Sequence, residues 1–148
     1  MSEARPDPVD AGTVAVGDTA PELVVENVDR EDFVKYAGAS GDFSRLHYDE
    51  PYATSLGNES VFAQGMLTAG YASHLVSDWL GLERITGFRV RFSDRVWPGD
   101  TVTASGEVTA VSETDAGVRV EASIRVTTQD GTVALTGDVT AVLPTDES

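Results

Sequence analysis

Residues 66–80 read Met-Leu-Thr-Ala-Gly-Tyr-Ala-Ser-His-Leu-Val-Ser-Asp-Trp-Leu, and Gly81 follows them. Apolar and small side chains lie nearly all the way round a helix of this sequence, which is typical of a helix buried on most faces. After Gly81, apolar residues alternate with polar ones in four runs, near 88–92, 102–110, 118–126 and 133–141. One buried helix followed by alternating strands predicts an α+β fold in which an antiparallel sheet wraps the helix.

The region before this helix is predicted to contain a strand, a helix and a long loop. Residues 22–26 form a candidate first strand, and Asp29 is a plausible N-cap of a helix that ends at Gly38 or shortly after. Residues 39–58 are rich in Gly, Ser, Asp and Pro, with one short helix expected near Pro51. We expect one domain over residues 1–148, with flexible tails at 1–15 and 144–148.

The charge balance restricts the partners of the protein. The chain of 148 residues carries 25 acidic and 10 basic side chains, for a net charge of −15. Such a surface repels polyanions, so nucleic acid and anionic membranes are not expected as partners. Lys35 is the only lysine. An acidic, lysine-poor chain suggests a salt-rich cytoplasm, since salt screens the repulsion, although an acidic protein of a low-salt organism is the alternative.

Other chemistries are disfavoured by composition. The chain has no cysteine and two histidines, His47 and His74, so we expect neither a thiol nucleophile nor a metal site. The N-terminus lacks a signal-peptide pattern, and no apolar run approaches the roughly 20 residues that span a bilayer. A cytoplasmic location is therefore expected. His74 lies within the predicted helix and is interpreted as a packing or interface residue.

The loop after Gly41 holds the most informative pair of side chains. Asp42 precedes His47 by five residues. In such a loop the two side chains can point at one water and exchange a proton with it near neutral pH. From spacing alone, the alternative is that Asp42 caps backbone amides and His47 is a half-buried hydrogen-bonding residue.

Three segments together resemble the MaoC-like hydratase/dehydratase family, which includes (R)-specific enoyl-CoA hydratases. They are Ser40-Gly-Asp-Phe, Leu46-His-Tyr-Asp and Gly65-Met-Leu-Thr-Ala-Gly, and residues 91–102 are similar to the family's strand, turn and strand. The resemblance covers roughly residues 15–142. It implies the hot-dog fold, in which an antiparallel sheet wraps one long helix, as the periodicity also indicates.

The resemblance assigns roles to individual residues. Asp42 and His47 would hold the water that adds to a 2-enoyl thioester, with His47 as the principal acid/base. Gly65 would donate its backbone N–H to the thioester oxygen, aided by the helix dipole. Ser44 and Arg45 stand where the family usually has Asn and Pro, and Gln64 where it often has His. The residues expected to contact substrate are Ser44, Gln64, Met66, Arg89 and Arg91.

Arg84, Arg89, Arg91 and Arg95 form the one basic stretch of the chain. They could meet the phosphates of coenzyme A or of a phosphopantetheine carrier. For each arginine alone, pairing with a carboxylate on the exposed sheet face is the favoured alternative.

The expected function is the reversible syn addition of water to a trans-2-enoyl thioester, giving the (R)-3-hydroxyacyl thioester. No cofactor or metal is expected, because coenzyme A or phosphopantetheine enters as part of the substrate. A homodimer or larger homo-oligomer is expected. The alternatives are a 3-hydroxyacyl-acyl-carrier-protein dehydratase subunit working with a partner chain, and a noncatalytic acyl-thioester-binding protein.

Overall fold

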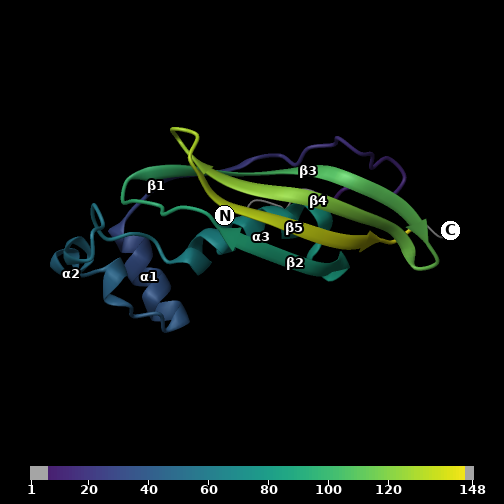
Figure 1. Cartoon of the computed structure of the whole chain (residues 1–148). Helices are drawn as coiled ribbons and strands as arrows, with labels where there is room; N and C mark the ends of the chain where they lie inside the picture. The colour runs from purple at the N-terminus through teal and green to yellow at the C-terminus, as the bar shows by residue number, and fades with distance from the viewer. Residues whose placement is uncertain (1–6, 146–148) are drawn as a thin grey trace.

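A computed structural model describes residues 7–145 of the chain. Five strands form one antiparallel sheet in the order β1-β3-β4-β5-β2, and the long helix α3 lies against one face of it (Figure 1). This arrangement confirms the expected α+β hot-dog fold. In chain order the elements are β1 (Leu23–Val28), α1 (Arg30–Ser40), the 3-10 helix η1 (Arg45–His47), α2 (Glu50–Ser55), α3 (Gly65–Leu80), the 3-10 helix η2 (Leu82–Arg84), β2 (Ile85–Phe92), β3 (Asp100–Thr114), β4 (Gly117–Thr128) and β5 (Val133–Leu143).

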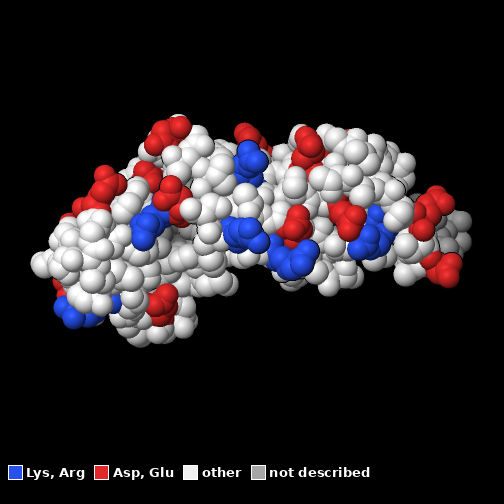
Figure 2. Space-filling model, in the orientation of Figure 1, with Lys and Arg blue, Asp and Glu red and all other residues white. Residues whose placement is uncertain are grey.

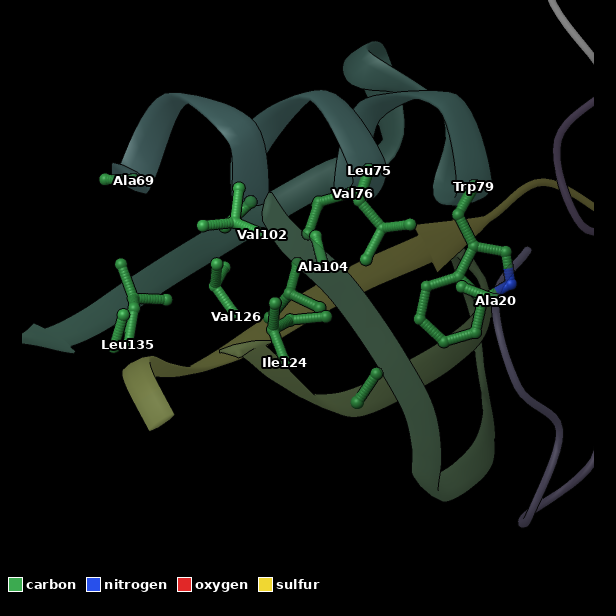
Figure 3. Packing of buried hydrophobic residues seen from close by; sticks show 14 of the residues in the cluster. Ala20, Ala69, Leu75, Val76, Trp79, Val102, Ala104, Ile124, Val126 and Leu135 are labelled. Atoms are coloured by element: carbon green, nitrogen blue, oxygen red, sulfur yellow. The ribbon is translucent and has the colours of Figure 1, made fainter. Parts of the chain in front are cut away.

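The core lies between α3 and the sheet. Figure 3 shows side chains of α3, among them Leu75, Val76 and Trp79, pointing toward side chains of β3, β4 and β5. The facing strand residues are the apolar members of each alternating run, including Ala104, Ile124 and Val126. Burial of these residues is what holds the helix on the sheet. The predicted alternation is therefore the pattern that fixes which face of each strand meets α3.

Gly106 on β3 packs closely against core side chains of α3 and β4. A Cβ atom built on Gly106 would lie 2.9 Å from a ring carbon of Trp79 and 3.0 Å from Cδ1 of Ile124. A side chain here would collide with the core, so the glycine allows Trp79 to lie directly on the sheet.

The helix α1 begins as expected and ends at Ser40, shortly after Gly38, which also agrees with the expectation. Asp29 accepts hydrogen bonds from the N–H groups of Glu31 and Asp32, and the Asp32 carboxylate accepts one from the Asp29 N–H, which makes a capping box. The helix continues to Ser40 because Gly41, with φ of 80°, provides the left-handed C-cap. The helices α1 and α2 lie together at one end of the sheet (Figure 1).

Part of the expected N-terminal tail packs against the core. The Val9 N–H donates a 2.8 Å hydrogen bond to the Trp79 carbonyl, and Val9, Ala11 and Val14 contact the core cluster. The expected tails also include residues 1–6 and 146–148, which lie outside the described residues.

His74 is exposed, and its Nε2 lies 3.0 Å from Oδ2 of Asp78 one turn along α3.

Within residues 7–145, no helix is both long and apolar enough to cross a membrane. The same part of the chain contains no group of three or more His, Cys, Asp or Glu side chains suited to hold a metal ion.

Candidate active site

The turn after α1 presents the carboxylate of Asp42. Gly41 redirects the chain at the end of the helix, and the Asp42 N–H then donates a 3.1 Å hydrogen bond to Ser40 Oγ. The Ser44 N–H donates to Asp42 Oδ1 at 3.3 Å. This bond occupies one carboxylate oxygen and orients the side chain, while Oδ2 points to His47. The Ser44 residue is exposed and caps η1 without a side-chain hydrogen bond.

His47 lies at the end of η1 with its two ring nitrogens in different surroundings. Nδ1 is 2.7 Å from the Phe62 carbonyl oxygen, and Nε2 is 3.8 Å from Asp42 Oδ2. A carbonyl oxygen can only accept, so Nδ1 carries the proton and the neutral ring keeps its lone pair on Nε2. The His47 side chain is 11% exposed and that of Asp42 43%. The pair therefore offers a proton acceptor beside a carboxylate at the edge of solvent, at a separation longer than a direct hydrogen bond.

The ring of Phe62 packs on His47, and that of Trp97 packs on Phe62. The rings of His47 and Phe62 meet edge to face with centroids 5.2 Å apart, and Phe62 meets Trp97 in the same way at 6.0 Å. The Arg95 guanidinium lies 5.1 Å from the centre of the Phe62 ring. Phe62 thus supplies both a carbonyl that holds His47 and a ring that covers it. Sequence reasoning missed this role, because a main-chain acceptor fifteen residues away leaves no side-chain signal.

Arg45 ties η1 to the start of α2. Its Nε and Nη2 donate to Asp49 Oδ2 at 3.1 and 2.9 Å, and its guanidinium lies 4.2 Å from the centre of the Tyr52 ring. The hydrogen bond from Arg45, followed by that from the Tyr52 N–H, lowers the pKa of Asp49. These contacts of Arg45 with Asp49 and Tyr52 stabilise the segment that carries His47 on the side that faces solvent.

Gly65 is the first residue of α3, where the backbone N–H has no acceptor within the helix. A Cβ atom at Gly65 would lie 3.2 Å from the nearest carbon of the Phe92 ring. Glycine therefore leaves room for Phe92, at the end of β2, to lie directly on the start of α3. The next residue, Met66, is 58% exposed. The N–H of Gly65 and the positive end of the helix dipole are suited to stabilise an oxyanion.

Gln64 precedes α3 and is fully buried. Its Nε2 donates a 2.8 Å hydrogen bond to the Phe33 carbonyl of α1, which anchors the start of α3 to that helix. Its Oε1 has no hydrogen-bond partner among the described residues. Only two residues separate Phe62, which holds His47, from Gly65. One short segment therefore positions both the candidate base and the candidate oxyanion donor.

The arginines of the basic stretch do not gather in one place. Arg84 donates to the Val9 carbonyl at 3.0 Å, and Arg95 stacks on Phe62. Arg89 and Arg91 alternate with Phe88 and Val90, which pack on the core, so both lie on the outer face of the sheet. The structure thus brings Asp42 and His47 together but places Arg89 and Arg91 on the face turned away from α3.

On the outer face, basic and acidic side chains lie side by side over the sheet (Figure 2). Arg89 Nη2 is 3.9 Å from Asp138 Oδ2. A surface pocket of about 940 Å³ lies in this region. Its lining includes Arg89, Arg91, Arg125, Glu107 and Asp138.

The comparisons with known proteins identify the family of the chain. The model of the MaoC like domain matches residues 12–130. The (R)-specific enoyl-CoA hydratase of Aeromonas caviae is 36% identical over 111 residues, covering 74% of this chain and 81% of that enzyme. The peroxisomal multifunctional enzyme type 2 of Mus musculus is 29% identical over 92 residues, 60% of this chain, and the matched part spans 12% of that enzyme.

Solved structures are similar over most of their length. The (R)-hydratase from A. caviae involved in PHA biosynthesis has a TM-score of 0.78 and 32% identity, covering 89% of this chain and 98% of that one. A chain of the ChsH1-ChsH2 complex from Mycobacterium tuberculosis has a TM-score of 0.76 and 29% identity, covering 88% of this chain and 99% of that one. Since the family model spans most of the described chain and the hydratase is similar over most of its own length, the protein belongs to the MaoC-like hydratase/dehydratase family.

Proposed function

We propose that the protein is an (R)-specific hydratase of trans-2-enoyl thioesters, acting reversibly to give (R)-3-hydroxyacyl thioesters. The observation that carries the proposal is the Asp42–His47 pair, in which the Phe62 carbonyl fixes the proton of His47 on Nδ1 and leaves Nε2 as a base 3.8 Å from the carboxylate. The similarity to the A. caviae hydratase supports it.

In the proposed reaction, Asp42 Oδ2 and His47 Nε2 hold one water. The water oxygen bonds to C3 of the enoyl thioester while Nε2 accepts a water proton. Electrons of the double bond move toward the thioester oxygen, and the N–H of Gly65 stabilises that charge. His47 then returns the proton to C2, which regenerates the neutral ring. Addition of both groups from one side gives the syn product.

The substrate brings its own carrier, coenzyme A or a phosphopantetheine group, and no separate cofactor or metal takes part in this proposal. Ser44 and Met66, both exposed, are proposed to border the substrate near Asp42 and Gly65 respectively. For Gln64 the proposed role is indirect, through its anchoring of α3. Arg89 and Arg91 remain proposed contacts only for a carrier that reaches the outer face of the sheet.

We propose that the chain assembles as a homodimer or a larger homo-oligomer, because β2 is an edge strand of the sheet. A dehydratase subunit that needs a different partner chain is a second candidate. The similarity to a chain of the two-protein ChsH1-ChsH2 complex favours it. Molar mass from size-exclusion chromatography with light scattering, together with activity of the purified chain alone, separates the two: an active homodimer supports the first, and an inactive chain rescued by a partner supports the second.

The hydratase proposal is tested by following the loss of enoyl-thioester absorbance with crotonyl-CoA while free thiol is measured in parallel. Loss of absorbance without thiol release, with a 3-hydroxyacyl product of R configuration, is expected. Thiol release would identify a thioesterase instead. Saturable acyl-CoA binding without turnover, in the presence of intact folded protein, would favour the noncatalytic alternative.

A further inference from the structure

Glu50 connects three segments of the chain around His47. It is the first residue of α2, and its side chain is 42% exposed. Oε2 accepts a 2.7 Å hydrogen bond from Arg30 Nη2 of α1, and Oε1 accepts a 3.0 Å hydrogen bond from the Val61 N–H. The same Arg30 nitrogen donates to Ser60 Oγ at 3.2 Å. The carboxylate therefore joins α1 and α2 to residues 60–61.

Residues 60–61 lead directly into Phe62, the residue that holds His47. The Phe62 N–H donates to the Leu46 carbonyl at 3.3 Å, and its carbonyl accepts from His47 Nδ1 at 2.7 Å. Val61 is fully buried, so its N–H needs an acceptor within the protein, and Glu50 provides it. The Val61 N–H belongs to the Ser60–Val61 peptide, two peptide groups before the Phe62 carbonyl, so loss of that acceptor would free the chain that leads into Phe62.

We propose that Glu50 is a positioning residue for His47: by binding the Val61 N–H, it holds the Phe62 carbonyl where it keeps the histidine proton on Nδ1. The Nε2 lone pair then stays directed toward Asp42. The consequence for turnover rests on the proposed hydration, whereas the consequence for the His47 tautomer does not depend on it.

The charge of Glu50 strengthens this arrangement. Hydrogen bonds from Ser60 and then Arg30, with a further one from the Val61 N–H, lower the pKa of Glu50 to about 2. The side chain is therefore an ionised acceptor at neutral pH, and hydrogen bonds to ionised acceptors are shorter and stronger than neutral ones. The adjacent Asp49 is already bound by Arg45 and by the Tyr52 N–H. The Asp49 carboxylate therefore does not take the place of Glu50 as the acceptor of the Val61 N–H.

Glu50→Ala removes the acceptor, and Glu50→Gln keeps an oxygen that can accept from the Val61 N–H. Glu50→Asp is a second disruptive variant: it retains a charged residue in the first turn of α2 but is one methylene shorter. Glu121→Ala is the matched control, since the Glu121 side chain is 44% exposed and ion-paired with Arg119 at 3.2 Å on β4. The readouts are kcat and KM for crotonyl-CoA and the long-range ¹H–¹⁵N spectrum of the His47 ring, assigned with a His74→Gln variant.

In Glu50→Ala and Glu50→Asp we expect kcat to fall about 10- to 100-fold, the scale of a small displacement of a catalytic group, with KM changed less than about twofold. The His47 spectrum should change from one Nδ1–H tautomer to a mixture. Glu50→Gln should recover most of both properties. The proposal is overturned if folded Glu50→Ala or Glu50→Asp matches Glu121→Ala in kcat and in the His47 spectrum. Absence of hydratase activity in the unaltered protein would refute the proposed function instead, and the spectra would still decide the role of Glu50.

Discussion

Gly65→Ala tests whether the start of α3 contributes an oxyanion donor. The added Cβ would lie 3.2–3.3 Å from three carbons of the Phe92 ring, so the ring must move by a few tenths of an ångström. Phe92 is 51% exposed and can do so, and alanine is the better helix former by up to about 1 kcal/mol. We therefore expect the free energy of unfolding to change by less than about 1 kcal/mol, which shifts Tm by about 2–4 °C at most.

Activity should respond much more strongly than stability. The new methyl group stands beside the N–H that the thioester oxygen must approach within about 2.7–3.1 Å. Loss of one such donor costs about 10²–10³ in kcat, so a decrease of about 10² in kcat is expected. The matched control is Gly70→Ala on the same helix, where nothing lies within 4 Å of the new Cβ. It should keep its activity and gain stability.

The assay is crotonyl-CoA hydration by both variants, with Tm measured by circular dichroism. A Gly65→Ala protein with kcat within about twofold of the unaltered chain would refute the oxyanion role. A Gly70→Ala protein that loses as much activity as Gly65→Ala would also refute it, because the effect would then not be local to the helix start.

Three further outcomes are expected. In Gly106→Ala the new Cβ would lie 2.9 Å from Trp79 and 3.0 Å from Ile124, so urea titrations should show the free energy of unfolding lowered by about 1–3 kcal/mol. Gly87→Ala is the control, because nothing lies within 4 Å of its Cβ, and it should not lower the free energy of unfolding. Equal effects of the two substitutions would contradict the packing argument. The pKa of Glu50 is lowered from 4.5 to about 2, so its stabilising contribution is complete above about pH 4.5 and is lost as the pH falls through 2. Urea titrations between pH 2 and 5 should thus show a flatter stability profile for Glu50→Gln than for the unaltered chain, and identical slopes would count against this. Raising KCl toward 1 M, where the Debye length is about 3 Å, should raise Tm because it screens the net charge of −15; a Tm that falls with added salt would refute the salt-rich interpretation.

The periodicity of the sequence was sufficient to predict the central helix and the strands. Residues 66–80 were expected as a helix, and the structure has Gly65–Leu80, because burial on most faces and the stop at Gly81 are both local signals. The end of α1 is predicted only to within a few residues, at Gly38 or shortly after, and the structure has it at Ser40. Both Gly38 and Gly41 could end the helix, and only backbone geometry shows that Gly41 takes the left-handed conformation.

The candidate site was predictable in its side chains and not in its main-chain contacts. Asp42 and His47 were expected from their motif, and the structure places them together. The Phe62 carbonyl and the Val61 N–H are main-chain groups that any residue type at these positions would supply. The sequence therefore gives no sign of the link from Glu50 to His47, which only the structure shows. The outward direction of Arg89 and Arg91, in contrast, follows from their alternation with apolar Phe88 and Val90, the same pattern that predicted the strand.

The central claim is that the Asp42–His47 pair adds water to an enoyl thioester. Its most direct test is the rate of crotonyl-CoA hydration by the unaltered chain and by His47→Ala and Asp42→Asn, each checked for native Tm. His47→Ala should lower kcat by at least about 10², the smaller effect expected on removing a general acid/base, and Asp42→Asn should also be impaired. Unaltered turnover in the folded His47→Ala protein would contradict the account.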